Sequence, residues 1–347
     1  VEGVIEERIG RLAQELRDLL TIASVEGEDF TAEVVARVQA VDVRGLVRQL
    51  SRELAQQHRL VSAVGRQRVG QQHLSLFRFH HNLFQKYLYS NLNPVERAYF
   101  HEDVGMVLEE LYGDEADAIA VQLAWHFSEA DLPEKARRYL AIAGEQARRR
   151  YANAEALSYL NRALDLTPDS DPVERYPLLL ARQKVYDVLA DRPAQRQDLA
   201  QLQALAQQLG DPRRQAEIAL CQALYADRLD EYREAVRYAQ RAIELAATSQ
   251  DVEQEARGYL YWGRALVNLA EYGESQPKLQ RALALAAAEQ LHEVQADSLR
   301  ALGVVAHFLG DYSQAEATYE QALTIYREVG DRRGEGHTLS NLGLVLR

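Results

Sequence analysis

Small and apolar residues recur at a fixed spacing in the C-terminal third of the chain, from about residue 213 onward. Ala223, Gly263, Gly303 and Gly343 lie 40 residues apart. Four further columns keep the same step: Tyr232, Tyr272 and Tyr312; Ala235, Ser275 and Ala315; Ala242, Ala282 and Ala322; Leu245, Leu285 and Ile325. A repeat of this length with helical composition predicts a solenoid, in which each unit buries its apolar side against its neighbours.

Within one repeat, the pattern predicts a helical hairpin. Gly303 stands in mid-helix, where glycine is about 1 kcal/mol less favourable than alanine, so we expect two helices to approach closely there. Gly310 and Asp311 are expected to end the first helix and begin the second, because glycine adopts the left-handed cap and aspartate accepts hydrogen bonds from backbone amides. Ala315 and Ala322 lie two turns apart, so both face the partner helix.

This pattern resembles the tetratricopeptide repeat over about residues 213–347. The family signature matches two successive repeats, as Tyr259, Trp262, Gly263, Tyr272, Ser275, Leu279 and Ala282, and as Leu299, Leu302, Gly303, Tyr312, Ala315, Tyr319 and Ala322. The spacing of 40 differs from the usual length of about 34. Residues 332–347 match the first helix of a further repeat whose second helix is missing. The resemblance implies an α-α superhelix.

The repeats are predicted to extend toward the N-terminus. Residues 118–170 fit the signature through Leu140, Gly144, Ala156, Leu160, Ala163 and Pro168. Residues 172–209 carry Gln183 and Gln195 where small residues belong, and we still predict a helical hairpin there. The predicted fold class is therefore all-α, with a superhelix over residues 113–347.

A different pattern precedes the repeats. The predicted elements are a helix over 5–22, a break over 24–30, a helix over 32–41 capped by Thr31, and a helix over 43–57 capped by Asp42. Two short β-type runs follow at 60–64 and 74–79, separated by a polar turn over 65–70, and a helix begins near Asn82. Helices followed by one β-hairpin predict a small winged-helix domain, to which we assign residues 1–112 with their connecting helices.

A second resemblance covers roughly residues 4–170. It rests on the segments Leu20 to Phe30, Phe77 to Leu83, Arg97 to His101 and Leu123 to His126. Together they resemble the signal-transduction ATPases with numerous domains (the STAND class), whose bacterial members include transcription regulators and conflict systems. This resemblance implies that the winged helix packs on a nucleotide-binding domain, and that His81 occupies a position able to touch the nucleotide's phosphate. The ATPase motor itself is missing from this sequence.

Composition narrows the class of protein. The chain is 47% hydrophobic and 27% charged, and no apolar run approaches the length of about 20 residues that spans a bilayer, so we expect a soluble, cytoplasmic protein. The single Cys221 excludes an internal disulfide and argues against a thiolate zinc site. The chain lacks an initial methionine and stops within a repeat, so we interpret it as a fragment.

The sequence contains no recognisable catalytic set. Residues 258–264 mimic the glycine spacing of a phosphate-binding loop but lack its lysine and fall within a predicted helix. His80, His81 and His101 lie near the winged helix, but a metal site needs three or four converging ligands, and we expect structural or interdomain roles. We predict a non-enzymatic protein without a cofactor or metal.

Charge is unevenly distributed along the chain. The net charge is −12, which disfavours general nucleic-acid binding, yet residues 44–97 carry nine Lys/Arg and two Glu, for a local charge of +7. The remainder therefore carries −19. Such a contrast predicts an anionic neighbour for the basic segment, either the missing ATPase domain or another acidic surface.

DNA is an alternative neighbour for this segment. Arg44, Arg48 and Arg52 recur four residues apart on one face of the presumed recognition helix, and Arg66 and Arg68 on the wing could contact phosphates. That alternative describes a DNA-binding transcription regulator. A tetratricopeptide scaffold without any ATPase is a further alternative.

The main functional hypothesis is a sensor arm of a larger ATPase that binds a protein or peptide in its concave groove. In such arrays the first helix of each hairpin lines the groove. The candidate groove residues are Arg148, Lys184, Arg228, Arg257, Arg264, Asn268, Arg300, His307 and Asn341. Cations in an acidic protein favour an acidic peptide or a carboxylate terminus. The alternative is a solvated face whose charges pair with nearby Glu and Asp, and we expect Trp262 and Phe308 to lie in the core.

Overall fold

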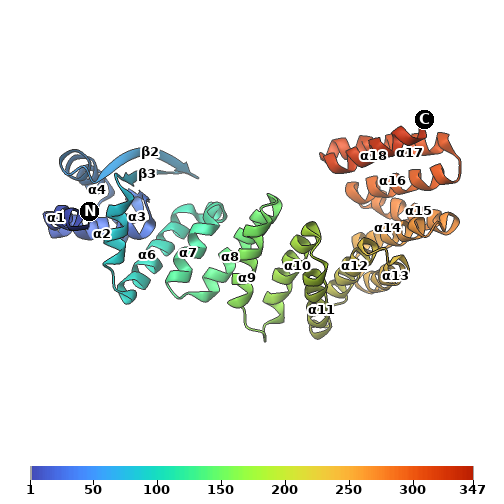
Figure 1. Ribbon diagram of the computed structural model, residues 1–347, viewed down its shortest axis with the longest axis horizontal. Coiled ribbons are helices and arrows are strands. Elements are labelled where there is room, and N and C mark those ends of the chain that lie inside the picture. Colours follow the sequence, from blue (N-terminus) through green and yellow to red (C-terminus); the bar gives the residue numbers. More distant parts are fainter. Residues whose placement is uncertain (1, 347) are drawn as a thin grey trace. The chain divides into compact units, whose positions relative to one another are not determined.

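The computed structural model describes residues 2–346. Helices dominate the chain (Figure 1), and its contacts divide it into two compact units, the first ending at Asp169 and the second beginning at Ser170. The predicted boundary between residues 112 and 113 falls within the first unit and stays a prediction.

The first unit combines a small sheet with helices. Its elements are, in order, α1 (Glu2–Gly10), α2 (Gln14–Glu26), β1 (Asp29–Thr31), α3 (Ala32–Val38), α4 (Val43–Gln49), the π-helix η1 (Leu50–Gln57), β2 (Val61–Val69), β3 (Gln72–Phe79), α5 (Asn82–Ser90), α6 (Pro94–Tyr112), the 3-10 helix η2 (Gly113–Ile119), α7 (Ala120–Glu129), α8 (Pro133–Arg149) and α9 (Asn153–Asp165).

The sheet has three antiparallel strands in the order β1-β3-β2. Phe30 of β1 lies opposite Phe77 of β3, and the two buried rings stack with their centroids 6.0 Å apart. The sequence predicted one hairpin and a break over residues 24–30, so β1 was missed. Three residues are too few to show the alternation by which a strand is recognised.

The wing hairpin differs from its prediction. The polar stretch over residues 65–70 was predicted to be the turn, but Gly65 to Val69 belong to β2, and the turn is at Gly70 and Gln71. A register shift between Ala63 and Gly65 marks a bulge. Because β2 is an edge strand exposed over most of its length, its outer residues can be polar on both faces, which hides the strand pattern.

The predicted helices are partly corrected. Residues 5–22 form two helices, α1 and α2, separated by a bend around Leu12. The helix over residues 43–57 is confirmed as the continuous pair α4 and η1, and Asp42 Oδ2 accepts a hydrogen bond from Gly45 N at 2.7 Å. The predicted side-chain cap at Thr31 is wrong, because its hydroxyl instead donates to Glu26 Oε1 at 2.6 Å.

The second unit consists of helical hairpins (Figure 1). Its elements are α10 (Pro172–Leu189), α11 (Arg192–Leu209), α12 (Pro212–Arg228), α13 (Tyr232–Ser249), α14 (Val252–Asn268), α15 (Tyr272–Ala288), α16 (His292–Phe308), α17 (Tyr312–Val329) and α18 (Arg332–Val345). The α-α superhelix predicted from the repeats is confirmed.

The signature glycines mark the helix crossings, as predicted. A Cβ on Gly303 would lie 2.5 Å from Cε1 of Tyr319, and one on Gly263 would lie equally close to Cδ2 of Leu279. Both distances are shorter than real Cβ contacts, so a side chain at either position would force the facing residue to move. Gly310 lies in the turn after α16 with a φ of 81°, and Asp311 Oδ1 accepts a hydrogen bond from Gln314 N at the start of α17, which confirms the predicted turn.

The first helices of successive hairpins pack against each other. α12 contacts α14, α14 contacts α16, and α16 contacts α18. These helices therefore line one side of the second unit, which we call the inner face. Six of the candidate groove residues lie on them: Arg228 on α12, Arg257, Arg264 and Asn268 on α14, and Arg300 and His307 on α16.

The degenerate hairpin over residues 172–209 is confirmed as α10 and α11. Its crossing uses amides instead of small residues: Gln183 and Gln195 are buried, and Gln195 Nε2 donates to Gln183 Oε1 at 3.3 Å. Beside them, Arg182 donates to both carboxylate oxygens of Asp198, which is 1% exposed. Hydrogen bonding satisfies these buried polar groups.

Candidate functional site

A polar network ties two first helices together on the inner face. Asp227, near the end of α12, accepts hydrogen bonds from Asn268 Nδ2 at 3.0 Å and from Arg264 Nη2 at 3.4 Å, both on α14. Asn268 is exposed, whereas Asp227 and Arg264 are half-buried. A guanidinium has five N–H donors, so Arg264 can still donate to a ligand. The network orders side chains that remain accessible.

A half-buried tyrosine lies near this network, with its ring centroid 5.9 Å from the Arg264 guanidinium carbon. Tyr261 of α14 is flanked on its own helix by Arg257 and Arg264, and it interacts electrostatically with Cys221 of α12 and Asp297 of α16. Burial raises the pKa of the Tyr261 hydroxyl. The side chain of Tyr261, with its neutral hydroxyl, therefore lies near both α12 and α16.

A second network lies at α16. Tyr326 of α17 donates its hydroxyl to Asp297 Oδ1 at 2.6 Å, and Arg300 donates to the same hydroxyl oxygen at 3.2 Å and to Asp297 at 3.1 Å. Burial, together with the Asp297 carboxylate, raises the pKa of Tyr326. Arg300 therefore has a structural function in the hairpin, whatever else it binds.

The structure places the nine predicted groove residues in different surroundings. Four of the arginines contact carboxylates: Arg148 contacts Glu145, Arg257 contacts Glu253 and Glu293, Arg264 contacts Asp227, and Arg300 contacts Asp297. Lys184 and Arg228 are exposed, and His307 and Asn341 are half-buried. Arg148 belongs to the first unit, so it is not part of the inner face. Their role in binding a partner stays a prediction.

An exposed aromatic cluster was missed by the sequence analysis. Phe308, predicted to be core, is 59% exposed and stacks on Tyr272 with ring centroids 5.1 Å apart. His307 lies edge-on to Phe308 and to Tyr312, which is 56% exposed. Phe308 ends α16, where no further turn covers it. The signal was present, since Tyr272 and Tyr312 belong to one 40-residue column just after the hairpin turns.

Trp262 was also predicted to lie in the core. It is half-buried, stacks on Tyr259 with ring centroids 6.3 Å apart, and lies under the ammonium of Lys278, whose Nζ is 4.2 Å from the ring centroid. Trp262 is therefore covered on part of its surface, whereas the prediction placed all of it in the core.

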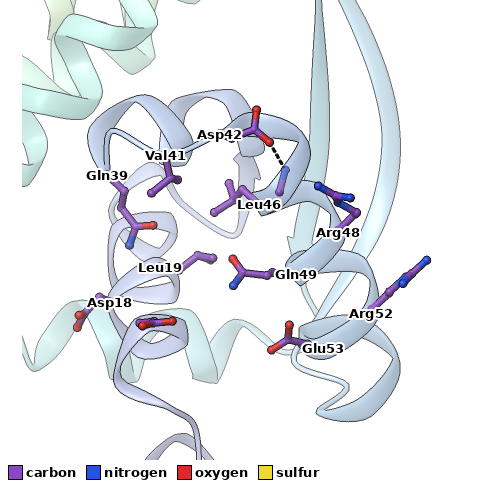
Figure 2. Close-up of a pocket in the computed structure, with 12 residues that line it drawn as sticks. Asp18, Leu19, Gln39, Val41, Asp42, Leu46, Arg48, Gln49, Arg52 and Glu53 are labelled. Atoms are coloured by element: carbon purple, nitrogen blue, oxygen red, sulfur yellow. Dashed lines mark hydrogen bonds between the residues drawn. The ribbon is translucent and has the colours of Figure 1, made fainter.

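The first unit contains a pocket of about 800 Å³ between α2 and the helix pair α4–η1. Figure 2 shows Leu19, Leu46 and Gln49 pointing toward its centre. Its lining is mixed in charge, because Glu15, Asp18, Asp42 and Glu53 accompany Arg48 and Arg52. In Figure 2, Arg48 and Arg52 point away from this pocket, on the side where the strands run.

The arginines of this helix pair lack carboxylate partners. Within α4 and η1 the exposed residues are Arg44, Arg48, Arg52, Gln56 and Gln57. Arg66 and Arg68 are exposed on β2, to which η1 packs. Among residues 2–346, no carboxylate forms an ion pair with any of these five arginines. We call the exposed side of α4, η1 and β2 the basic face.

The histidines of the first unit fall into two groups. His81 is exposed and directly precedes α5, so its nucleotide-sensing role stays a prediction. His101 and His126 are fully buried, with their Nδ1 atoms 2.9 Å apart, and the Tyr89 hydroxyl lies 3.0 Å from His101 Nε2. Burial lowers the pKa of His101 to about 4 and that of His126 to about 3. Both imidazoles are therefore neutral.

Two further features are absent from the described part of the chain. Within residues 2–346, no three or more His, Cys, Asp or Glu side chains converge in a way that could hold a metal ion. Among the same residues, no helix combines the length and the apolar character needed to cross a membrane.

Comparison with known proteins identifies the repeats. Residues 254–328 match the sequence model of the tetratricopeptide repeat family. No curated protein sequence matches the chain. The fold is similar to that of a signal-transduction ATPase with numerous domains, with a tetratricopeptide repeat sensor, from Pyrococcus horikoshii. That likeness has a TM-score of 0.51 at 16% identity and covers 99% of this chain and 55% of the other.

Two further solved structures share the fold. A Rap protein complexed with Competence and Sporulation Factor matches with a TM-score of 0.55 at 14% identity, over 75% of this chain and 78% of the other. Aspartyl phosphate phosphatase F from Bacillus subtilis matches with a TM-score of 0.54 at 13% identity, over 96% and 80% of the two chains. At these identities the likeness concerns the fold alone.

Proposed function

We propose that this chain is the non-enzymatic sensor arm of a multidomain STAND ATPase, and that the inner face of its second unit binds a protein or peptide. The chain spans 55% of the length of the STAND protein whose fold it resembles, so the nucleotide domain is part of the proposal. The complex of a Rap protein with Competence and Sporulation Factor supports the idea that a superhelix of this kind accommodates another molecule.

The inner-face network is the observation that carries this proposal. Asp227 holds Arg264 and Asn268 in place, yet Asn268 is exposed and Arg264 is half-buried. Side chains ordered before binding lose less conformational entropy when a ligand arrives. The exposed rings of Phe308 and Tyr312 add apolar surface of the kind that dominates protein interfaces.

The pairing of the arginines refines the expected ligand. An acidic peptide must share Arg264 with Asp227, so a single carboxylate placed at the unused donors of Arg264 fits better than a run of carboxylates. A peptide that also offers an apolar or aromatic side chain to Phe308 would use both features. The proposed ligand is therefore a peptide or protein segment that combines a carboxylate with an apolar anchor.

Charge reversal at Arg264 tests this proposal. Labelled protein would be titrated against an array of short peptides graded in carboxylate and aromatic content. We expect Arg264→Glu to weaken the best binder at least about tenfold, which corresponds to about 1.4 kcal/mol. The matched control is Arg237→Glu on α13, a second helix, because Arg237 also contacts a carboxylate, that of Glu234. Equal losses in both variants, or no loss in either, would exclude the inner face as the binding site.

Regulation of the ATPase domain has its own test. In a chain that carries the nucleotide domain, the same peptide should change the rate of ATP hydrolysis, because a ligand shifts the balance between two states only if it binds them unequally. His81→Ala in that chain should alter nucleotide affinity. An unchanged affinity would remove His81 from the nucleotide site.

A further inference from the structure

We propose that the basic face of the first unit binds double-stranded nucleic acid. The continuous helix α4–η1 exposes only arginine and glutamine, at Arg44, Arg48, Arg52, Gln56 and Gln57. These two residue types are the side chains that pair in bidentate fashion with the major-groove edges of guanine and adenine. Glu53, the one carboxylate of this helix, is half-buried. The face therefore combines charge for phosphates with amides and guanidinium groups for base edges.

The change from α-helix to π-helix aligns the arginines. Four residues exceed one α-helical turn of 3.6 residues, so Arg48 is rotated slightly forward from Arg44. In a π-helix, with hydrogen bonds from i to i+5, four residues fall short of a turn, so Arg52 is rotated back. Since η1 begins at Leu50, between the second and third arginine, the two rotations oppose each other. The backbone positions of the three arginines therefore stay close to one line along the helix.

The edge strand adds a second contact surface beside this row. η1 packs against β2, where Arg66 and Arg68 are both exposed. They are two residues apart, so they extend from the same face of the strand. A helix inserted into a groove would place the hairpin near the flanking backbone, and contacts with phosphates there would fix the register of the complex.

The surroundings favour nucleic acid over an acidic protein as the ligand. Protein interfaces have a core that is depleted of charge and enriched in aromatic residues. The basic face has no exposed aromatic ring on α4, η1 or β2, and Val64 is its one exposed large apolar side chain among the described residues. The carboxylates of Asp18 and Asp42 line the same pocket as Arg48 and Arg52, whose side chains extend outward from its centre (Figure 2).

The test is a binding titration of the whole chain with labelled duplex DNA of about 30 base pairs, which is about three helical turns. If all five arginines contact phosphates, the logarithm of the affinity should fall with the logarithm of salt concentration with a slope of about −4.5. The triple variant Arg44→Glu, Arg48→Glu and Arg52→Glu should lose at least tenfold in affinity and reduce the slope by about three.

The control removes the same charge elsewhere. Arg196, Arg233 and Arg332 are exposed on α11, α13 and α18, and we expect their joint reversal to glutamate to change DNA affinity less than threefold. Failure of the unmodified chain to bind at low salt would overturn the proposal. An equal loss in the control triple would do so too, because binding would then depend on net charge alone. Competition by polyglutamate as strong as that by DNA would assign the face to an acidic protein instead.

Discussion

Two sets of arginines, one in each unit, differ in what they contact. In the second unit, Arg182, Arg264 and Arg300 each donate to a carboxylate and are at most 27% exposed. On the basic face of the first unit, Arg48 and Arg52 are exposed, with no carboxylate partner among the described residues. Asp198 and Asp227 lie on helices next to those of their arginines, whereas Asp297 lies one turn from Arg300 on the same helix. These hydrogen bonds stabilise the packed helices. An arginine that the fold does not use remains available to a ligand.

The largest expected effect concerns the helix crossings of the second unit. Gly303→Leu should lower the free energy of unfolding by more than about 3 kcal/mol, because even a Cβ there would lie 2.5 Å from the Tyr319 ring. Gly343 belongs to the same sequence column but has no described atom near its Cβ position. Gly343→Leu should therefore be neutral or slightly stabilising, given the helix propensity of leucine.

Urea unfolding followed by circular dichroism measures both variants. If they are equally destabilised, the glycine column reflects local helix geometry, and the close crossing of two helices does not explain why glycine recurs.

This pair of glycines also shows what sequence can and cannot reveal. The 40-residue columns predicted the hairpins, their turns and the close contact at Gly303, because every repeat packs the same positions against its neighbours. The sheet was predicted less well, since β2 is an exposed edge strand and β1 has only three residues. A strand shows an alternating pattern of apolar and polar residues only where one of its faces is buried.

The candidate site was harder to predict than the fold. The sequence placed Arg264 and Arg300 at groove positions but did not identify their partners. Asp227 reaches Arg264 from a neighbouring helix, and Asp297 lies one turn from Arg300 on the same helix. The exposure of Phe308 depends on α16 ending at that residue. Spacing along one helix cannot distinguish a paired arginine from a free one.

The next effect in size tests the structural arginines. Asp198→Ala removes both hydrogen bonds that Asp198 accepts from Arg182, and the carboxylate is nearly fully buried. We expect a loss of about 2 kcal/mol in the free energy of unfolding. Glu234→Ala, which removes the exposed partner of Arg237, should leave the unfolding midpoint unchanged. Similar behaviour of the two variants would show that burial does not set the strength of these pairs.

Acidification should destabilise the first unit selectively. The folded-state pKa values of His101 and His126, about 4 and about 3, lie below the ordinary value of 6.5, so the unfolded chain takes up protons first as pH falls. Their contribution to stability is full above about pH 6.5 and is lost as pH falls toward 4. The slope is about 1.4 kcal/mol per pH unit for each histidine.

The two tryptophans separate the units in this experiment. Trp125 lies against His101, with ring centroids 4.7 Å apart, whereas Trp262 reports on the second unit. In a Trp262→Phe variant the tryptophan fluorescence reports on the first unit, and in a Trp125→Phe variant it reports on the second. Equal acid sensitivity of both signals would assign the effect to the carboxylates of the whole chain instead of to the histidine pair.

The smallest expected effect is an absence of change on the basic face. The triple substitution Arg44→Gln, Arg48→Gln and Arg52→Gln should alter the free energy of unfolding by less than about 0.5 kcal/mol, because these side chains make no ion pair that the fold depends on. The matched pair Arg264→Gln and Arg300→Gln should destabilise the second unit measurably, since both donate hydrogen bonds across helices. If the triple variant unfolds as readily as this pair, the arginines of the basic face stabilise the domain after all, and their exposure does not indicate a ligand. If it retains full stability and loses affinity for DNA, the same substitution separates binding from folding.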